Sequence, residues 1–178
     1  MNIQSAIMEG MNILKDKRID SAKLDSEILL ASAIDRDRKY IILNNNQNIK
    51  EENLRYFQEL INKRSFREPI AYLTNKKYFW KYKFFVTKGA LIPRPDTELI
   101  VDQILQLTKF KTKMKILDIG VGSGCILLTI LKERKNFYGV GVDISKKCLN
   151  ISKINAKYLD VSSRVKFFKT DVDKFALG

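Results

Sequence analysis

The sequence contains no histidine, and this absence removes whole classes of catalytic site. Ser-His-Asp and Cys-His catalysis and every metal site with a His ligand are excluded. The two cysteines, Cys125 and Cys148, are too few for a disulfide framework or a four-Cys zinc site. We therefore expect no metal site, and we interpret Cys125 as a small buried residue and Cys148 as a helix-packing residue rather than as nucleophiles.

Long hydrophobic runs are also missing. No stretch approaches the roughly 18–20 apolar residues that span a bilayer. The first 20 residues lack the unbroken apolar segment and the small-residue cleavage site of a signal peptide. With 45% apolar and 30% charged residues, the composition is typical of a soluble globular protein. We expect a cytoplasmic monomer with no membrane partner.

Charge of one sign is in excess, with 33 Lys and Arg against 20 Asp and Glu and a net charge of +13. Such an excess suggests nucleic acid as a partner, since Lys and Arg neutralise phosphates. The densest basic run is KFKTKMK at 109–115, and the remaining basic residues are spread along the chain. We favour a solvated Lys-rich surface over a phosphate-binding stripe.

Glycine is scarce in the first half of the chain, with one residue before position 89 and five of the eight between 120 and 141. Residues 1–74 instead show the apolar periodicity of helices. Asp20 or Ser21 can cap the second of them, and Glu51 and Glu52 suit the first turn of another. We predict a small helical bundle whose inward residues are Ile3, Ile7, Met11, Leu14, Leu24, Ile28, Leu29, Ala31, Leu54, Phe57, Leu60 and Ile61.

After Pro69 the period changes from helical to alternating. Aromatic residues occupy every second position of the segment KKYFWKYKFFV, which predicts a β-hairpin within residues 76–87 and a linker over 75–92. Such an aromatic ladder with interleaved lysines can stack single-stranded bases. We favour packing of the hairpin against a neighbouring domain. The alternating aromatics are Tyr78, Trp80, Tyr82 and Phe84.

From residue 115 the pattern alternates between strand and helix, which predicts an α/β domain with a parallel sheet and right-handed crossovers. We assign this domain to residues 93–178. The expected strands are 115–119, 136–144 and 164–172, and the expected helices are 123–134 and 146–159.

A glycine-rich loop separates the first of these strands from its helix, in the sequence Asp118-Ile119-Gly120-Val121-Gly122-Ser123-Gly124. Glycines allow positive φ and let a ligand approach the backbone. A phosphate-gripping loop would need Lys after its last Gly, where this chain has Cys125. A dinucleotide fingerprint fails as well, because it would need Gly at position 125 or 127.

An acid ends the next strand: Asp143 lies 19 residues beyond Gly124. A carboxylate there can accept hydrogen bonds from both ribose hydroxyls. The combination resembles the cofactor site of Rossmann-like methyltransferases that use S-adenosylmethionine. By this resemblance Gly120, Val121, Gly122, Ser123, Gly124 and Asp143 bind the cofactor, while Asp171 meets the adenine amino group and Val172 lines its ring. Asp171 could alternatively cap a helix.

Several segments outside the glycine loop resemble the release-factor glutamine methyltransferases of the HemK/PrmC type. Phe85-Val86 followed by LIPRPDTELI at 91–100 is similar to the segment that precedes their catalytic domain. REPIAYLT at 67–74 resembles their inter-domain segment, and LDSEILL at 24–30 resembles a helix of their first domain. The likeness runs from about residue 20 to the C-terminus.

The resemblance implies a helical domain that recognises a protein substrate, followed by a Rossmann-like methyltransferase domain that uses S-adenosylmethionine. The implied substrate is the Gln side-chain amide in the Gly-Gly-Gln motif of class I peptide chain release factors. Since an amide nitrogen is a poor nucleophile, the enzyme must orient it in line with the methyl group. The sulfonium of the cofactor carries the hard chemistry.

The family's catalytic segment, Asn-Pro-Pro-Tyr, is absent, so we assign no catalytic residue in this chain and expect that segment beyond Gly178. The parallel sheet is then cut after its third strand. An incomplete sheet exposes an unpaired edge and an apolar face. We accordingly predict that the 178-residue chain alone is poorly stable and inactive.

Two alternatives stay open. One is a nucleic-acid methyltransferase acting on adenine or tRNA, and the other is a non-catalytic cofactor-binding remnant. The roles of Arg94 and Glu98 also stay open. For Asp96 we favour capping of a helix over 97–107, where acids complement the helix dipole.

Overall fold

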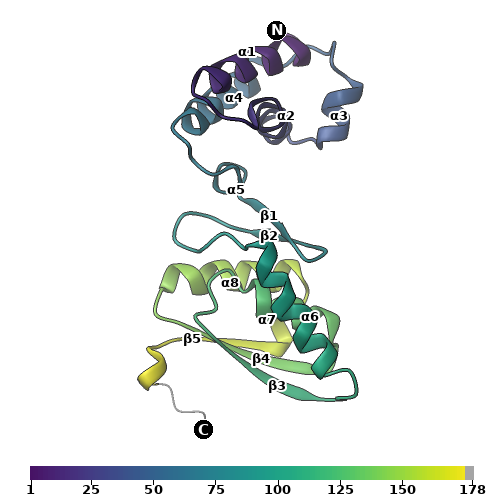
Figure 1. Cartoon of the computed structure of the whole chain (residues 1–178), viewed down its shortest axis with the longest axis vertical. Coiled ribbons are helices and arrows are strands. Elements are labelled where there is room, and N and C mark those ends of the chain that lie inside the picture. The colour runs from purple at the N-terminus through teal and green to yellow at the C-terminus, as the bar shows by residue number, and fades with distance from the viewer. Residues whose placement is uncertain (175–178) are drawn as a thin grey trace. The chain divides into compact units, whose positions relative to one another are not determined.

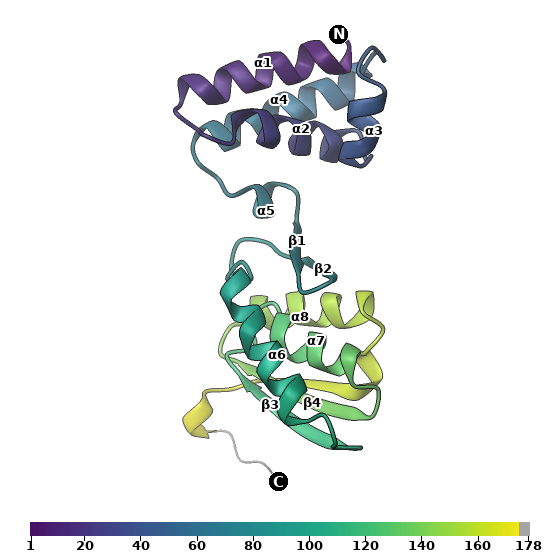
Figure 2. The same cartoon turned by 45° about the vertical axis from the view of Figure 1, so that its right-hand side comes forward.

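A computed structural model describes residues 1–174 and divides the chain into two compact units, Met1–Thr74 and Asn75–Gly178. The two units are drawn in Figure 1 and, turned by 45°, in Figure 2. None of the helices in residues 1–174 has the length and apolar character that crossing a membrane requires.

The first unit is built from helices alone, as the periodicity predicted (Figure 2). Asn2 caps the first helix by accepting a hydrogen bond from the Ser5 amide, and Asp37 caps the third through the Tyr40 amide. Glu51 and Glu52 lie in the first turn of the fourth. The helices are α1 (Ile3–Asp16), α2 (Ala22–Ala33), α3 (Arg38–Leu43), α4 (Glu51–Ser65) and α5 (Ile70–Leu73).

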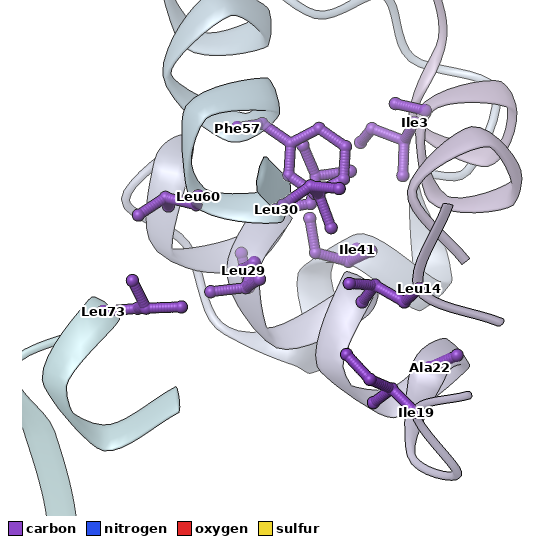
Figure 3. Close-up of a cluster of buried hydrophobic side chains, with 13 residues drawn as sticks. Ile3, Leu14, Ile19, Ala22, Leu29, Leu30, Ile41, Phe57, Leu60 and Leu73 are labelled. Atoms are coloured by element: carbon purple, nitrogen blue, oxygen red, sulfur yellow. The ribbon is translucent and has the colours of Figure 1, made fainter. Parts of the chain in front are cut away.

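One apolar cluster fills the centre of this unit, and Figure 3 shows its side chains pointing toward one another from α1, α2, α3, α4 and α5. Most of the residues expected inside are buried there, but Leu24 is 42% exposed. On α2, Asp25, Ser26 and Glu27 are each nearly inaccessible to solvent, on different sides of the helix. These polar groups are buried because each has a hydrogen-bond partner.

The buried carboxylates of α2 are both paired with arginines. Asp25 accepts a 2.7 Å hydrogen bond from Nε of Arg64 on α4, and Glu27 accepts one of 2.6 Å from Nε of Arg38 on α3. An unpaired buried carboxylate would cost several kcal/mol, on the order of the whole stability of a small domain. The pairs therefore tie α2 to α4 and to α3.

The second unit begins with an antiparallel hairpin of β1 (Lys76–Phe79) and β2 (Tyr82–Phe85), which confirms the predicted hairpin. The alternating aromatic residues do not all lie on one face of the hairpin, because the turn at Trp80 and Lys81 interrupts the alternation. Phe79 and Phe84 are buried against each other, with ring centroids 6.1 Å apart, whereas Tyr78 is 71% exposed.

The hairpin turn is anchored by two carboxylates. The Trp80 amide donates a 2.7 Å hydrogen bond to Glu98, and the Trp80 indole donates one of 3.1 Å to Glu133. The hydroxyl of Tyr82 donates to the same Glu133 oxygen at 2.7 Å. Glu98 therefore has a structural partner, although the sequence left its role open.

Three parallel strands, β3 (Met114–Ile119), β4 (Phe137–Asp143) and β5 (Val165–Lys169), form a sheet in that spatial order. Helix α7 (Cys125–Glu133) connects the first pair and α8 (Lys146–Tyr158) the second, while α6 (Glu98–Leu107) packs beside α7. The alternation confirms the predicted α/β class, and the described part has the Rossmann-like arrangement of parallel strands joined by helices.

The helices of this unit lie on one side of the sheet, as Figures 1 and 2 both show. Gly139 of β4 faces them so closely that a Cβ there would lie 2.8 Å from Leu127 of α7. The opposite side carries Ile119, Tyr138 and Phe168, which are 55%, 45% and 45% exposed. In residues 75–174 this side of the sheet is thus partly open, and it also carries the exposed Lys115 and Lys166.

Two predicted boundaries were wrong. The third strand ends at Lys169, because Asp171 turns the chain by accepting hydrogen bonds from the Asp173 amide on its side chain and from the Lys174 amide on its carbonyl. A 3₁₀ turn, Pro95–Thr97, precedes α6, so Asp96 lies outside that helix and makes no side-chain cap.

Candidate functional site

The glycine loop leaves β3 after Ile119 and enters α7 at Cys125. Gly120, Gly122 and Gly124 have φ values of +75°, +55° and +80°, a region that costs an L-residue about 1–2 kcal/mol. A Cβ at Gly120 would meet nothing within 4 Å, and one at Gly122 would meet only the Gly120 carbonyl at 3.8 Å. The chain thus leaves open space beside the first two glycines.

Gly124 is surrounded differently. A Cβ there would lie 2.7 Å from Leu128 and 3.2 Å from Oγ of Ser152. Its amide donates a 2.7 Å hydrogen bond to the Val121 carbonyl, which closes the turn into α7. Two of the three glycines therefore keep space for a ligand, and the third lets helix, loop and α8 pack together.

The base of the loop is fixed to the neighbouring strand. Ile119 pairs with Val142 in the parallel register, and the Val142 carbonyl accepts hydrogen bonds of 2.9 and 3.0 Å from the amides of Gly120 and Val121. This double contact extends the β3–β4 pairing by two residues. It places the loop beside the carboxyl end of β4, where ligands bind in open α/β sheets.

Asp143 is the last residue of β4 and reaches into the loop. Its Oδ2 accepts a 3.0 Å hydrogen bond from the Gly122 amide, and its Oδ1 accepts one of 2.8 Å from the Ser145 amide. Each carboxylate oxygen has two lone pairs, so both keep acceptor capacity for a hydroxyl-bearing ligand. The structure thus brings the loop and the acid together, as their order in the sequence predicted.

Two residues of α8 hold the loop from the other side. Oγ of Ser152 donates a 2.8 Å hydrogen bond to the Gly122 carbonyl, and Nδ2 of Asn155 donates one of 2.8 Å to the Ser123 carbonyl. Both side chains are fully buried. Neither residue was predicted for the site, although two polar residues on the inward face of a helix are a recognisable signal.

Asp118, on β3 directly before the loop, has an unusual environment. Burial raises the pKa of its carboxyl from 3.8 to about 6, with the nearby charge of Asp143 adding to the effect and a hydrogen bond from the Leu127 backbone opposing it. At pH values below about 6 this carboxyl is mostly neutral, so Asp118 then adds little negative charge beside the glycine loop.

The cysteines are both free. Cys125 is half-buried rather than buried, while Cys148 is buried as expected. Desolvation still raises the pKa of Cys125 to about 11, which keeps it a thiol. Sγ of Cys148, on α8, lies 3.1 Å from the Gly89 carbonyl. Among residues 1–174, no group of three or more His, Cys, Asp or Glu side chains is placed to hold a metal ion.

Asp171 and Val172 lie just beyond the end of β5, the strand that pairs with β4. The Thr170 amide donates a 3.2 Å hydrogen bond to the Asp143 carbonyl, so this segment follows the same edge of the sheet as Asp143. Both side chains are exposed, and Asp171 caps the local turn. Their assignment to an adenine ring stays a prediction.

Two family models match the chain. Residues 5–74 match the PrmC N-terminal domain, and residues 110–177 match a methyltransferase domain. Among solved structures, a SAM-dependent methyltransferase from Geobacter sulfurreducens in complex with S-adenosyl-L-homocysteine is 25% identical, with a TM-score of 0.41. That likeness covers 47% of this chain and 32% of the other.

Curated relatives cover more of the chain. The release factor glutamine methyltransferase of Clostridium acetobutylicum is 36% identical over 97% of this chain and 60% of its own length. That of Buchnera aphidicola subsp. Acyrthosiphon pisum is 37% identical over 96% of this chain and 60% of its own. This chain thus spans about 60% of the length of these relatives. With a match to the PrmC N-terminal domain followed by a match to a methyltransferase domain, the chain is similar to release factor glutamine methyltransferases over almost all of its 178 residues.

Proposed function

We propose that the loop of Gly120–Gly124 binds S-adenosylmethionine, and that the protein serves methyl transfer to a glutamine of a release factor. The observation that carries the cofactor assignment is the hydrogen bond from the Gly122 amide to Asp143. It joins a loop with open space over two glycines to a carboxylate at the end of the adjacent strand. The matched methyltransferase domain supports the same assignment.

The residues present suit this cofactor better than a phosphate-bearing nucleotide. Asp143 offers acceptors to two ribose hydroxyls. The loop lacks the Lys of a phosphate-gripping loop and the last Gly of the dinucleotide fingerprint. Val121 and Ser123 would lie against the cofactor with Gly120, Gly122 and Gly124, and Asp171 and Val172 would meet the adenine. When bound, the sulfonium supplies an activated methyl group.

The finer substrate, the Gln of the Gly-Gly-Gln motif in class I release factors, is our proposal as well. It is supported by relatives named release factor glutamine methyltransferases that align with 96–97% of this chain. The 178 residues contain no Asn-Pro-Pro-Tyr sequence. By the family resemblance, that segment orients the glutamine amide. We therefore expect this chain to bind the cofactor without turning substrate over.

Isothermal titration of the chain with S-adenosylhomocysteine tests the cofactor assignment. We expect saturable one-to-one binding, whereas ATP, as a phosphate-bearing control with the same adenosine, should bind at least about tenfold more weakly. Equal binding of the two ligands, or no binding of S-adenosylhomocysteine at millimolar concentration, would contradict the assignment.

Transfer of a labelled methyl group tests the assignment of the release-factor glutamine as the substrate. A class I release factor, the same factor with its motif Gln replaced by Asn, and a tRNA are offered to the 178-residue chain and to a family member that contains Asn-Pro-Pro-Tyr. We expect label only on the unaltered release factor and only with the longer protein. Transfer to tRNA would favour the nucleic-acid alternative, and substantial turnover by the 178-residue chain would contradict the role given to the absent segment.

A further inference from the structure

Asn155 is a polar residue in the last turn of α8, with no exposure to solvent. Burying an amide without partners costs on the order of 2 kcal/mol or more, so its hydrogen bonds matter for the fold. Its side chain makes three of them, and they go to two segments far apart in the sequence.

The first segment is the hairpin. Oδ1 of Asn155 accepts a 2.7 Å hydrogen bond from the Phe85 amide, and Nδ2 donates one of 2.9 Å to the Phe85 carbonyl. The side-chain amide therefore satisfies both backbone groups of one strand residue, as a neighbouring strand would. This contact fixes the end of β2 on α8.

The second segment is the glycine loop. The remaining hydrogen of Nδ2 goes to the Ser123 carbonyl at 2.8 Å, next to the Gly122 carbonyl that Ser152 holds at the same distance. Since a planar trans peptide points its C=O and N–H in opposite directions, holding these two carbonyls turns the Ser123 and Gly124 amides away from α8. The orientation of the loop backbone thus depends on α8.

We propose that Asn155 is a positioning residue that couples the hairpin to the glycine loop. One amide group bonds to both β2 and the loop, so loosening of either segment frees the Asn155 side chain to move and weakens its hydrogen bonds to the other. A ligand that orders the loop then also orders the end of β2, and the reverse holds with equal strength. The ligand part of this inference rests on the proposed cofactor site, whereas the coupling itself does not.

Residue-resolved amide hydrogen exchange on the whole chain, without ligand, tests the coupling. The variant is Asn155→Leu, which keeps the volume and removes all three hydrogen bonds. The matched control is Leu149→Ala, which weakens a buried apolar position of the same helix and leaves the hydrogen bonds in place. Each protein is measured at the same number of degrees below its own melting temperature.

The informative amides are those of Gly122 and Gly124, because Asn155 contacts neither of them directly. Their partners are Asp143 and the Val121 carbonyl. We expect both to exchange about tenfold faster in Asn155→Leu than in Leu149→Ala, within the range typical of coupled sites. Equal exchange in the two variants would overturn the proposal.

Ser152→Ala provides a milder test if Asn155→Leu does not fold. It removes only the contact to the Gly122 carbonyl, so the loop amides should exchange faster and, through Asn155, the Phe85 amide should exchange faster as well, by a smaller factor. A loosened loop with Phe85 as protected as in the wild type would overturn the coupling. A loop unaffected by Ser152→Ala would contradict the claim that α8 sets the loop orientation.

Ligand titration adds the link to function. In the wild type, S-adenosylhomocysteine should slow exchange of the Phe85 amide, and in Asn155→Leu its affinity should fall about tenfold while Leu149→Ala stays within about twofold. If the wild type binds no S-adenosylhomocysteine, the proposed cofactor site fails, and the ligand-free exchange rates still decide the coupling. Binding by the wild type with Phe85 exchange unchanged would overturn the coupling alone.

Discussion

The amide of Gly122 donates a 3.0 Å hydrogen bond to Oδ2 of Asp143, which lies 21 residues later at the end of the neighbouring strand. The contact holds the carboxylate against the backbone of the loop, whose first two glycines leave open space. Because a second amide, that of Ser145, holds Oδ1, the carboxylate cannot rotate freely. Loop shape and acid position are therefore set together.

Replacing this acid by its amide, Asp143→Asn, should weaken binding of S-adenosylhomocysteine about tenfold to a hundredfold. An Asn side chain has one oxygen for the two amides that the carboxylate satisfies, and hydrogen bonds to a charged group contribute about 1.5–3 kcal/mol. Titration calorimetry measures the effect. Asp160→Asn, at an exposed residue with φ of +56° that Asn tolerates, is the control and should bind as the wild type does. Unchanged affinity in Asp143→Asn would remove the acid from the site.

Adding one methyl group at Gly122→Ala should affect binding more than stability. Its φ of +55° costs Ala about 1 kcal/mol, while the added Cβ would clash with no atom of the described protein. The methyl group would instead occupy the open space beside the loop. Thermal unfolding followed by circular dichroism should show a shift of a few degrees, with affinity for S-adenosylhomocysteine reduced at least about tenfold. A variant that unfolds as expected but binds normally would place the ligand elsewhere.

Gly10→Ala in the helical unit should lower stability and leave ligand binding unaffected. Ala normally favours a helix, yet a Cβ at Gly10 would lie 2.7 Å from Oγ of Ser26, 2.8 Å from Phe57 and 2.9 Å from Ile61. Such overpacking typically costs about 1–3 kcal/mol. Amides of residues 1–74 should exchange faster with solvent hydrogen in Gly10→Ala. Glu9→Ala, at the exposed neighbouring position, should leave their exchange rates unchanged. A more stable Gly10→Ala variant would show that α1 and α4 can move apart.

The raised pKa of Asp118 predicts a pH-dependent stability. Because the carboxyl titrates at about 6 in the folded state and at 3.8 as a free side chain, the folded chain binds more protons between these values. Stability therefore falls as pH rises from about 4 to about 6, by up to about 3 kcal/mol for a shift of this size. Above pH 6 the whole loss is present.

Asp118→Asn removes this ionisation and keeps an oxygen for the Leu127 amide. Urea unfolding should show the variant to be more stable than the wild type at pH 7.5 and nearly equal to it at pH 4. Asp173→Asn, an exposed residue of the same unit, should change neither value. An equal gain at both pH values would point to packing rather than to the charge.

Much of the fold follows from periodicity. The spacing of Ile3, Leu14, Phe57 and Leu60 placed them correctly in one core, because these positions return to the same side of their helices. Leu24 was assigned wrongly, since the pattern cannot tell that Asp25 and Glu27 find arginine partners on two other helices and are buried, while Leu24 is exposed. The hairpin was predicted, but its turn at Trp80 was not, because Glu98 and Glu133 stabilise it from distant positions.

The sequence by itself determined the glycine loop, the acid that follows it and the order of strand and helix, because these depend on residue type and spacing along the chain. Only the tertiary structure decided that Asp143 bonds to Gly122, that Asn155 joins the loop to β2, and that burial raises the pKa of Asp118. The physical reason is that hydrogen-bond partners and desolvation are set by which segments meet in space. Here those segments lie 21 to 70 residues apart in the sequence.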